Sequence, residues 1–128
     1  MEKLIIEKTS TTPYIELDKE NNNLKFIGKS FPENTFEFYK PVINWLKEYF
    51  KSSVDTKVEV ELEYLNSSSL KAYFDIFDIF EDSIVDNESI ISISWIYHEE
   101  NDIALETGED FLEDFECLDI KLVVKTDD

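Results

Sequence analysis

The sequence contains very few of the residues on which redox, catalytic and nucleotide-binding sites depend. In 128 residues there are one cysteine, one histidine and two glycines. A single cysteine, Cys117, cannot form an internal disulfide, which is typical of a protein in a reducing compartment. The two isolated glycines cannot build the glycine-rich loops that hold nucleotide phosphates. Disulfide scaffolds and the known nucleotide-binding motifs are therefore excluded.

Groups for nucleophilic catalysis are equally scarce. Such catalysis needs a base beside the nucleophile, and His98 is the only histidine. We interpret His98 as an ordinary surface or loop residue. Cys117 follows the acidic run 113–116, and neighbouring carboxylates disfavour a reactive thiolate. We therefore predict that Cys117 is a small core residue and that the protein is not an enzyme.

Positive charge is also in deficit. Thirty acidic residues and twelve basic ones give a net charge of −18. A polyanion of this size repels nucleic acids and anionic lipid headgroups, so we expect no nucleic-acid or membrane partner. The opening Met1-Glu2-Lys3 is followed by only three apolar residues, unlike a signal peptide, and no segment is long enough to span a bilayer. We expect a cytoplasmic protein whose partners are proteins or cations.

The carboxylates do not follow the spacing of a metal site. Residues 18–29 resemble a calcium-binding loop only superficially, because Asn23 replaces the mid-loop glycine and Lys29 replaces the final glutamate. A second acidic cluster has helical spacing but lacks the histidine that di-iron helices require. We predict no metal and no cofactor. We interpret the second cluster as a solvated face or a docking surface for a basic partner; it consists of Glu106, Glu109, Asp110, Glu113 and Asp114.

Hydrophobic residues, by contrast, are plentiful. They make up 42% of the chain, and aromatic residues make up 14%, which excludes a disordered polymer. The length fits a single domain spanning residues 1–128, with a frayed end at 125–128. Alternation and local composition predict strands over residues 4–7, 14–18, 24–27, 57–64, 91–97 and 118–124.

Three further segments have the apolar spacing of amphipathic helices. The first follows Asn34, an N-cap with Glu37 as its capping-box partner, and Pro41 predicts a kink there or a restart near Lys40. The second runs through residues 70–84 and the third covers about 102–115.

The order of these elements predicts the fold class. Strand, helix and strand over 57–97 form a right-handed crossover, so the two strands are expected to be parallel. The strands alternate instead of being continuously apolar, which indicates that helices cover one face only. In the strand 57–64, the apolar face is predicted to carry Val58, Val60, Leu62 and Tyr64. We predict an α/β fold with a mixed β-sheet and helices mainly on one face.

One segment carries a candidate functional site. The strand 57–64 leads through Leu65 and Asn66 into three serines, Ser67, Ser68 and Ser69, at the start of the second helix. If Asn66 is the N-cap, Ser67 is the first helical residue. A phosphate there would add about −1.5 to −2 charges and be favoured by the helix end, and Lys71 lies one turn further on. Spacing alone does not choose among the three serines.

A series of short motifs occurs along the chain in a fixed order. They are Thr12-Pro13, Gly28-Lys29-Ser30-Phe31-Pro32-Glu33-Asn34, Phe38-Tyr39, Trp45-Leu46, Tyr64-Leu65-Asn66-Ser67-Ser68-Ser69-Leu70-Lys71, Trp95-Ile96-Tyr97 and Glu106-Thr107-Gly108-Glu109-Asp110-Phe111. In this order and spacing the motifs resemble the SiaC family of bacterial regulatory phosphoproteins. The resemblance implies a STAS-like fold, similar to anti-sigma-factor antagonists. It also implies phosphorylation of the residue after Asn66, which is Ser67 here although the family usually has threonine, with Ser68, Ser69 and Lys71 beside it.

The resemblance implies partners as well. The family is linked to a dedicated protein kinase, a PP2C-type phosphatase and, in some bacteria, a diguanylate cyclase that the unphosphorylated form activates. The resulting hypothesis is a non-enzymatic signalling switch in which phosphorylation of Ser67 controls docking on an output protein. The alternative is a constitutive acidic binding module in which the serines only cap a helix.

Overall fold

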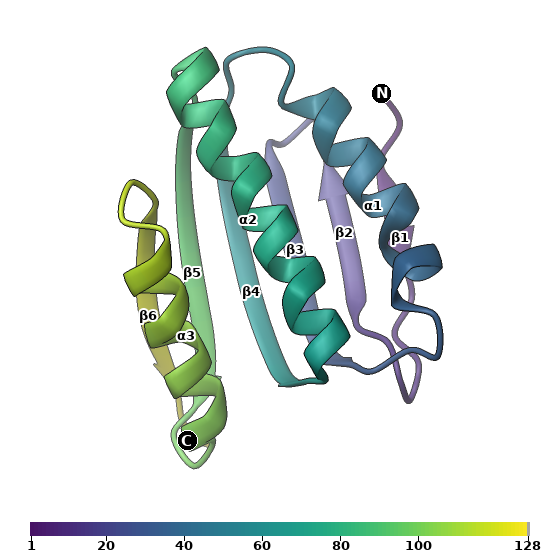
Figure 1. The fold of residues 1–128 in the computed structure, drawn as a ribbon, viewed down its shortest axis with the longest axis vertical. Helices are drawn as coiled ribbons and strands as arrows, with labels where there is room; N and C mark the ends of the chain where they lie inside the picture. Colours follow the sequence, from purple (N-terminus) through teal and green to yellow (C-terminus); the bar gives the residue numbers. More distant parts are fainter. Residues whose placement is uncertain (128) are drawn as a thin grey trace.

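The alternating segments form one six-stranded sheet, and the amphipathic segments form three helices (Figure 1). The structure, a computed structural model, describes residues 1–127. The strands are β1 (Leu4–Ile6), β2 (Tyr14–Asp18), β3 (Asn23–Ser30), β4 (Asp55–Leu65), β5 (Ile90–His98) and β6 (Asp119–Lys125). The helices are α1 (Thr35–Tyr49), α2 (Ser67–Asn87) and α3 (Asp102–Asp114).

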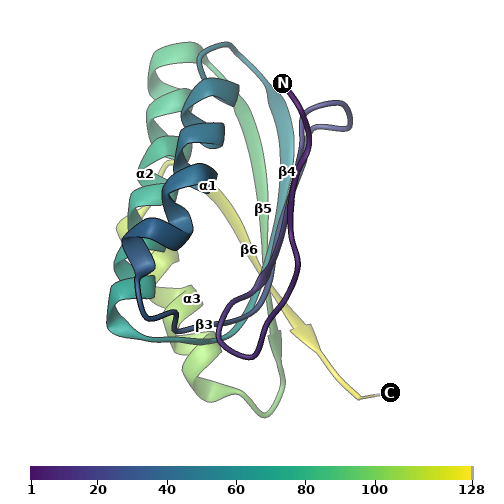
Figure 2. The same cartoon turned by 90° about the vertical axis from the view of Figure 1, so that its right-hand side faces the viewer.

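The strands lie in the sheet in the same order as in the chain. β1, β2 and β3 pair antiparallel, whereas β3 to β6 pair parallel through the three helices. Right-handed crossovers that always step in the same direction place their helices on the same side. Figure 2 shows α1, α2 and α3 on one face, with the other face uncovered. The predictions of a mixed sheet, of one covered face and of parallel β4 and β5 are confirmed.

A β-bulge changes which side chains of β4 face the helices. Gly28 pairs with Leu62 but Lys29 pairs with Tyr64, so Glu63 is an extra residue without a partner. Gly28 has a φ of 128°, a backbone angle that side-chain-bearing residues rarely adopt. Beyond the bulge the alternation shifts by one residue. The predicted inward position of Tyr64 is therefore wrong: its side chain is 49% exposed.

Helix α1 is continuous through its proline. The Asn34 side chain accepts a hydrogen bond from the Glu37 N–H at 3.1 Å, so the predicted N-cap is confirmed. Pro41 lies inside the helix, so of the two predicted alternatives the restart near Lys40 is wrong, while a kink at Pro41 stays a prediction. Proline removes a single backbone donor, while the fully buried Val42 and Leu46 hold the following turns of α1 in the core.

The core fills the space between the sheet and the helices. Its largest fully buried side chains include Trp95, Tyr73, Phe77 and Phe111, and the Phe77 and Phe111 rings meet edge to face at 4.7 Å. No helix in the described part of the chain is long and apolar enough to cross a membrane.

The predicted frayed end, residues 125–128, overlaps the last strand by one residue. Lys125 is the last residue of β6 and pairs with His98, so the expected frayed segment does not begin at 125. Asp128 lies outside the described residues.

Candidate functional site

The candidate site is the serine turn, residues 66–69, which connects β4 to α2. The Asn66 side chain accepts a hydrogen bond from the Ser69 N–H at 2.9 Å, so the predicted N-cap is confirmed and Ser67 is the first residue of the helix. The turn lies at the end of the molecule where β3 and β4 finish and all three helices begin (Figure 1). The carboxyl ends of parallel strands are where ligands of open α/β sheets usually bind.

Ser69 belongs to the core. It is completely buried, and its hydroxyl lies 2.8 Å from that of Ser30. The Ser30 hydroxyl lies 2.7 Å from the Tyr39 hydroxyl, which donates to Tyr73 at 3.0 Å. Because the one Tyr39 proton is used toward Tyr73, Ser30 must donate to Tyr39, and Ser69 to Ser30. Burial raises the pKa of Tyr39 to about 12, so this chain of hydroxyls stays protonated.

Ser68 is exposed but has two hydrogen-bond partners. Its hydroxyl donates to the Asn66 side-chain oxygen at 3.2 Å and lies 2.8 Å from the Thr35 hydroxyl. Since the single Ser68 proton is used toward Asn66, Thr35 is the donor in the second bond. Ser68 thereby joins the first turn of α1 to the first turn of α2.

Ser67 differs from both of its neighbours. Its side chain is exposed, and within residues 1–127 its hydroxyl makes no hydrogen bond. Lys71 is also exposed and, four residues further along α2, lies on the same side of the helix. Among the three serines, Ser67 combines access from solvent with a hydroxyl that no other group uses.

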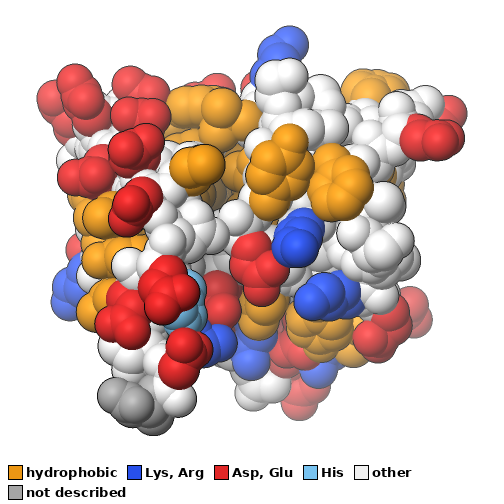
Figure 3. Space-filling view, turned by 90° about the horizontal axis from the view of Figure 1, so that it is seen from below, with side chains coloured by type: hydrophobic (Ala, Val, Ile, Leu, Met, Phe, Trp, Pro, Cys, Tyr) orange, Lys and Arg blue, Asp and Glu red, His pale blue; other side chains and the backbone are white. Residues whose placement is uncertain are grey.

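Exposed apolar side chains occur at the same end of the molecule. Phe36 at the start of α1 is 76% exposed and Ile103 at the start of α3 is 70% exposed. Tyr64 lies beside Phe31, with ring centroids 5.7 Å apart. Figure 3 shows this end, with hydrophobic side chains among charged ones and acidic side chains gathered on the α3 side. The sequence alone gives no signal for this apolar surface, because only the bulge and the meeting of helix starts bring these residues together.

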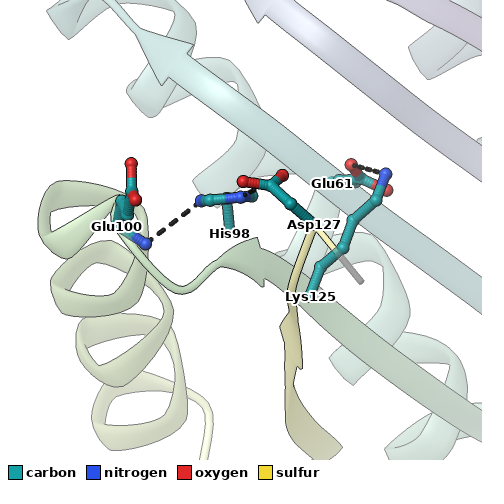
Figure 4. Close-up of polar contacts among 5 residues, drawn as sticks. All are labelled: Glu61, His98, Glu100, Lys125 and Asp127. Atoms are coloured by element: carbon teal, nitrogen blue, oxygen red, sulfur yellow. Dashed lines mark hydrogen bonds and ion pairs between the residues drawn. The ribbon is translucent and has the colours of Figure 1, made fainter.

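The histidine lies in a separate polar cluster. The His98 Nε2 atom is 2.8 Å from an Asp127 carboxylate oxygen, and Nδ1 accepts a hydrogen bond from the Glu100 N–H (Figure 4). Lys125 and Glu61 form an ion pair at 3.1 Å nearby. The hydrogen bond to Asp127 raises the pKa of His98, and the charges of Asp127, Glu100 and Glu99 act in the same direction. Within residues 1–127, His98 makes no hydrogen bond to a serine, threonine or cysteine side chain, and its interpretation as an ordinary surface residue stays a prediction.

We expect Asp127→Asn to lower the pKa of His98 toward about 6.5, the usual histidine value. The His98 pKa is raised by folding, so the stabilisation that Asp127 provides is present below the unfolded-state pKa and is lost as the pH rises through the folded-state pKa. An NMR titration of the imidazole checks the shift. The exposed carboxylate Asp86, at the other end of the molecule, supplies the control: Asp86→Asn should leave the His98 titration unchanged, and an equal shift in both variants would contradict a local pair.

The prediction that Cys117 is a small core residue is wrong. Cys117 is exposed, and the buried position at the end of α3 is taken by Phe115 instead. The Cys117 thiol donates to a Glu81 carboxylate oxygen at 3.2 Å. Partial burial and this bond raise the pKa of the thiol, in agreement with the expectation of an unreactive cysteine. Among the described residues, no group of three or more histidine, cysteine and acidic side chains is arranged to hold a metal ion.

Known proteins are similar to this chain in sequence and in fold. The model of the SiaC family, described as SiaC family regulatory phosphoprotein, matches residues 6–125. A protein of Pseudomonas aeruginosa (strain UCBPP-PA14) is 34% identical over 115 residues, 89% of this chain and 90% of that protein. Crystalline apo-SiaC from P. aeruginosa is 30% identical, with a TM-score of 0.85 over 96% of this chain and 99% of its own.

A second solved structure shows a relative with its partner. It contains SiaC from P. aeruginosa in complex with the diguanylate cyclase SiaD, whose activator it is. That SiaC is 31% identical to this chain, with a TM-score of 0.88 over 95% of this chain and 99% of its own.

Fold and family match together define a regulatory phosphoprotein built on an α/β sheet. The chain belongs to the SiaC family. The resemblance inferred from the sequence motifs is confirmed, whereas the likeness to STAS domains stays a prediction.

Proposed function

We propose that this protein is a non-enzymatic signalling switch whose state is set by reversible phosphorylation of Ser67. The observation that carries the proposal is the difference among the three serines. Ser67 alone has a solvent-exposed hydroxyl without a hydrogen-bond partner in the described part of the chain, whereas Ser69 is buried and Ser68 is bonded to Asn66 and Thr35. A kinase must reach a free hydroxyl, and Ser67 offers one.

The position of Ser67 suits a phosphate. At the first residue of α2 the group would meet the positive end of the helix, which stabilises a negative charge by roughly 0.3–1 kcal/mol. Lys71 can approach it from one turn further on. The added charge of about −1.5 to −2 would change the surface that a partner meets, without a change of fold.

The partners in this proposal follow the family. A protein kinase adds the phosphate, a PP2C-type phosphatase removes it, and an output protein docks on the unphosphorylated form. A diguanylate cyclase is the proposed output protein, because the SiaC of P. aeruginosa is the activator of one. We place the switch in the cytoplasm, where the kinase and the cyclase have access to nucleoside triphosphates.

We expect intact-protein mass spectrometry of the chain purified from its native host to show a fraction one phosphate heavier. Peptide fragmentation should place that phosphate on Ser67. Ser67→Ala should remove it, while the matched variant Ser68→Ala, which changes the neighbouring exposed hydroxyl, should keep it. Both variants should retain the melting temperature within about 2 °C, because exposed serines contribute little to stability.

Two results would count against the proposal. Phosphate on Ser68 would keep the switch but move its acceptor by one residue. Complete absence of phosphate, together with equal binding of the output protein by wild type and Ser67→Ala, would favour the second candidate function.

That second candidate is a constitutive binding module. Its supporting observation is the acidic cluster on α3, whose members are all exposed in the structure; they are Glu106, Glu109, Asp110, Glu113 and Asp114. Such a surface would attract a basic partner in any phosphorylation state.

A further inference from the structure

A groove lies between α1 and α2, immediately beside the serine turn. Its volume is about 400 Å³, and Figure 1 shows the two helices side by side above the sheet. One wall comes from α1 and presents successive turns of a single helix face. The other wall comes from the first turns of α2. The lining residues that matter here are Phe36, Lys40, Ile43 and Lys47 of α1, and Lys71, Ala72 and Asp75 of α2.

The groove has a charge opposite to that of the molecule. Three lysines and one aspartate line it, which leaves a net charge of +2 in a chain whose net charge is −18. Within residues 1–127, none of the three lysines takes part in a salt bridge. Three ammonium groups without a salt-bridge partner among the described residues therefore border one apolar groove, a feature that the overall composition hides.

The shape of the groove indicates what kind of segment it can hold. From Phe36 to Lys47 it follows α1 for about 16 Å, at a rise of 1.5 Å per residue, which corresponds to about three helical turns. Apart from the carbonyl that Pro41 leaves without a donor, the backbone groups in the interiors of α1 and α2 bond within their own helices. An extended strand would therefore find almost no main-chain partners here. A helix satisfies its own backbone and can place an apolar stripe on Ile43, Ala72 and the 76% exposed Phe36.

We propose that this groove docks an amphipathic helix of the output protein, with apolar residues on its buried side and carboxylates along its flanks. The apolar floor would receive the stripe, and Lys40, Lys47 and Lys71 would pair with the carboxylates. This inference rests on the proposed function, because it names the chemistry of the partner that the switch controls.

The groove also gives the phosphate a physical means of control. Ser68 lines the groove together with Lys71, and Ser67 is the adjacent residue. A phosphate on Ser67 would carry about −1.5 to −2 charges, enough to offset nearly the whole net charge of the groove. It would also occupy Lys71, which lies one turn away on the same side of α2. The docked helix would lose an ammonium partner, and its carboxylates would be repelled by the negatively charged phosphate.

The test uses the full-length protein and a synthetic helical peptide about 15 residues long, with leucines at spacings of three and four and glutamates on both flanks. Fluorescence anisotropy at about 0.15 M salt measures binding. We expect Lys40→Glu/Lys47→Glu to weaken binding roughly 10-fold or more, since the two reversals replace attraction by repulsion. The control Lys57→Glu/Lys121→Glu makes the same charge change on the uncovered sheet face and should bind like wild type. Amide shifts in NMR spectra should locate the peptide on α1 and α2.

The possible outcomes separate this inference from the phosphorylation switch. Equal affinity for wild type and Lys40→Glu/Lys47→Glu, no binding of the acidic peptide, or amide shifts on the uncovered sheet face would each overturn the groove proposal. Tighter binding of a peptide with lysine in place of glutamate would do the same and favour a basic partner on α3. All of these measurements use unphosphorylated protein, so none depends on whether Ser67 is modified. Phosphoserine installed at 67 should weaken acidic-peptide binding by a similar factor.

Discussion

Gly108→Ala should destabilise the protein by about 2 kcal/mol, although alanine is normally the better helix residue. Gly108 lies in the middle of α3, where alanine would gain about 1 kcal/mol in an exposed helix. Here a Cβ atom would lie 2.6 Å from Cδ1 of Trp95 and 2.8 Å from a methyl group of Leu122. Overpacking of a core costs about 1–3 kcal/mol, and the Trp95 ring has no room to move.

The Trp95 ring is held from two directions. It is fully buried, and its Nε1–H donates to the Ala104 carbonyl oxygen of α3 at 3.0 Å. Urea unfolding followed by tryptophan fluorescence measures the change. Glu109→Ala, at the exposed neighbouring position, should change stability by less than about 0.5 kcal/mol. A stabilised Gly108→Ala variant would mean that α3 does not pack on Trp95 as the structure shows.

Ser30→Ala should also destabilise the protein, by roughly 2 kcal/mol. The change removes the middle hydroxyl of the buried chain, so Tyr39 loses its donor and Ser69 loses its acceptor. A buried polar group without a partner costs about 1–3 kcal/mol. The chain offers a matched control in Ser68→Ala, which removes a hydroxyl–hydroxyl bond of the same 2.8 Å length at an exposed position. Water replaces that bond, so the control should stay within about 0.5 kcal/mol of wild type.

The measurement is again urea unfolding, with hydrogen exchange of the first amides of α2 as a second readout. Because the chain of hydroxyls ties the start of α2 to β3 and α1, Ser30→Ala should speed exchange there more than at the end of α2. Equal losses of stability in Ser30→Ala and Ser68→Ala would show that burial of the chain does not matter.

The sequence predicts those parts of the fold that depend on neighbouring residues. Val58, Val60 and Leu62 alternate with glutamates, and this local pattern is enough to indicate a half-covered strand. Asn34 and Asn66 are N-caps because a cap needs only the three residues that follow it. The same local pattern predicts the wrong orientation for Tyr64. That orientation depends on a bulge, which arises where β4 pairs with Gly28 and Lys29 of β3. The burial of Cys117 is also predicted wrongly, because Phe115 occupies the buried position at the end of α3.

The candidate site also has a part that the sequence predicts and a part that it does not. Local sequence is enough to predict that segment 66–69 is a capped helix start with three serines. The difference among those serines depends on residues far away in the chain: Ser30 and Tyr39 bury Ser69, and Thr35 engages Ser68. The lysine-bordered groove cannot be predicted from the sequence pattern, because its lysines come from two helices and the chain as a whole has many more acidic than basic residues.

The agreement between strand order and chain order has a consequence for how the protein is made. Each parallel strand is joined to its sheet neighbour by the single helix between them. Every β–α–β unit can therefore form from sequence that has already left the ribosome, and the sheet can lengthen in one direction during translation. Each parallel pairing still has to close a loop across one helix, a step that slows the folding of parallel sheets, but none has to wait for a later part of the chain. Until β6 is synthesised, the growing sheet ends at β5, whose unpaired backbone is the edge on which a stalled nascent chain would aggregate.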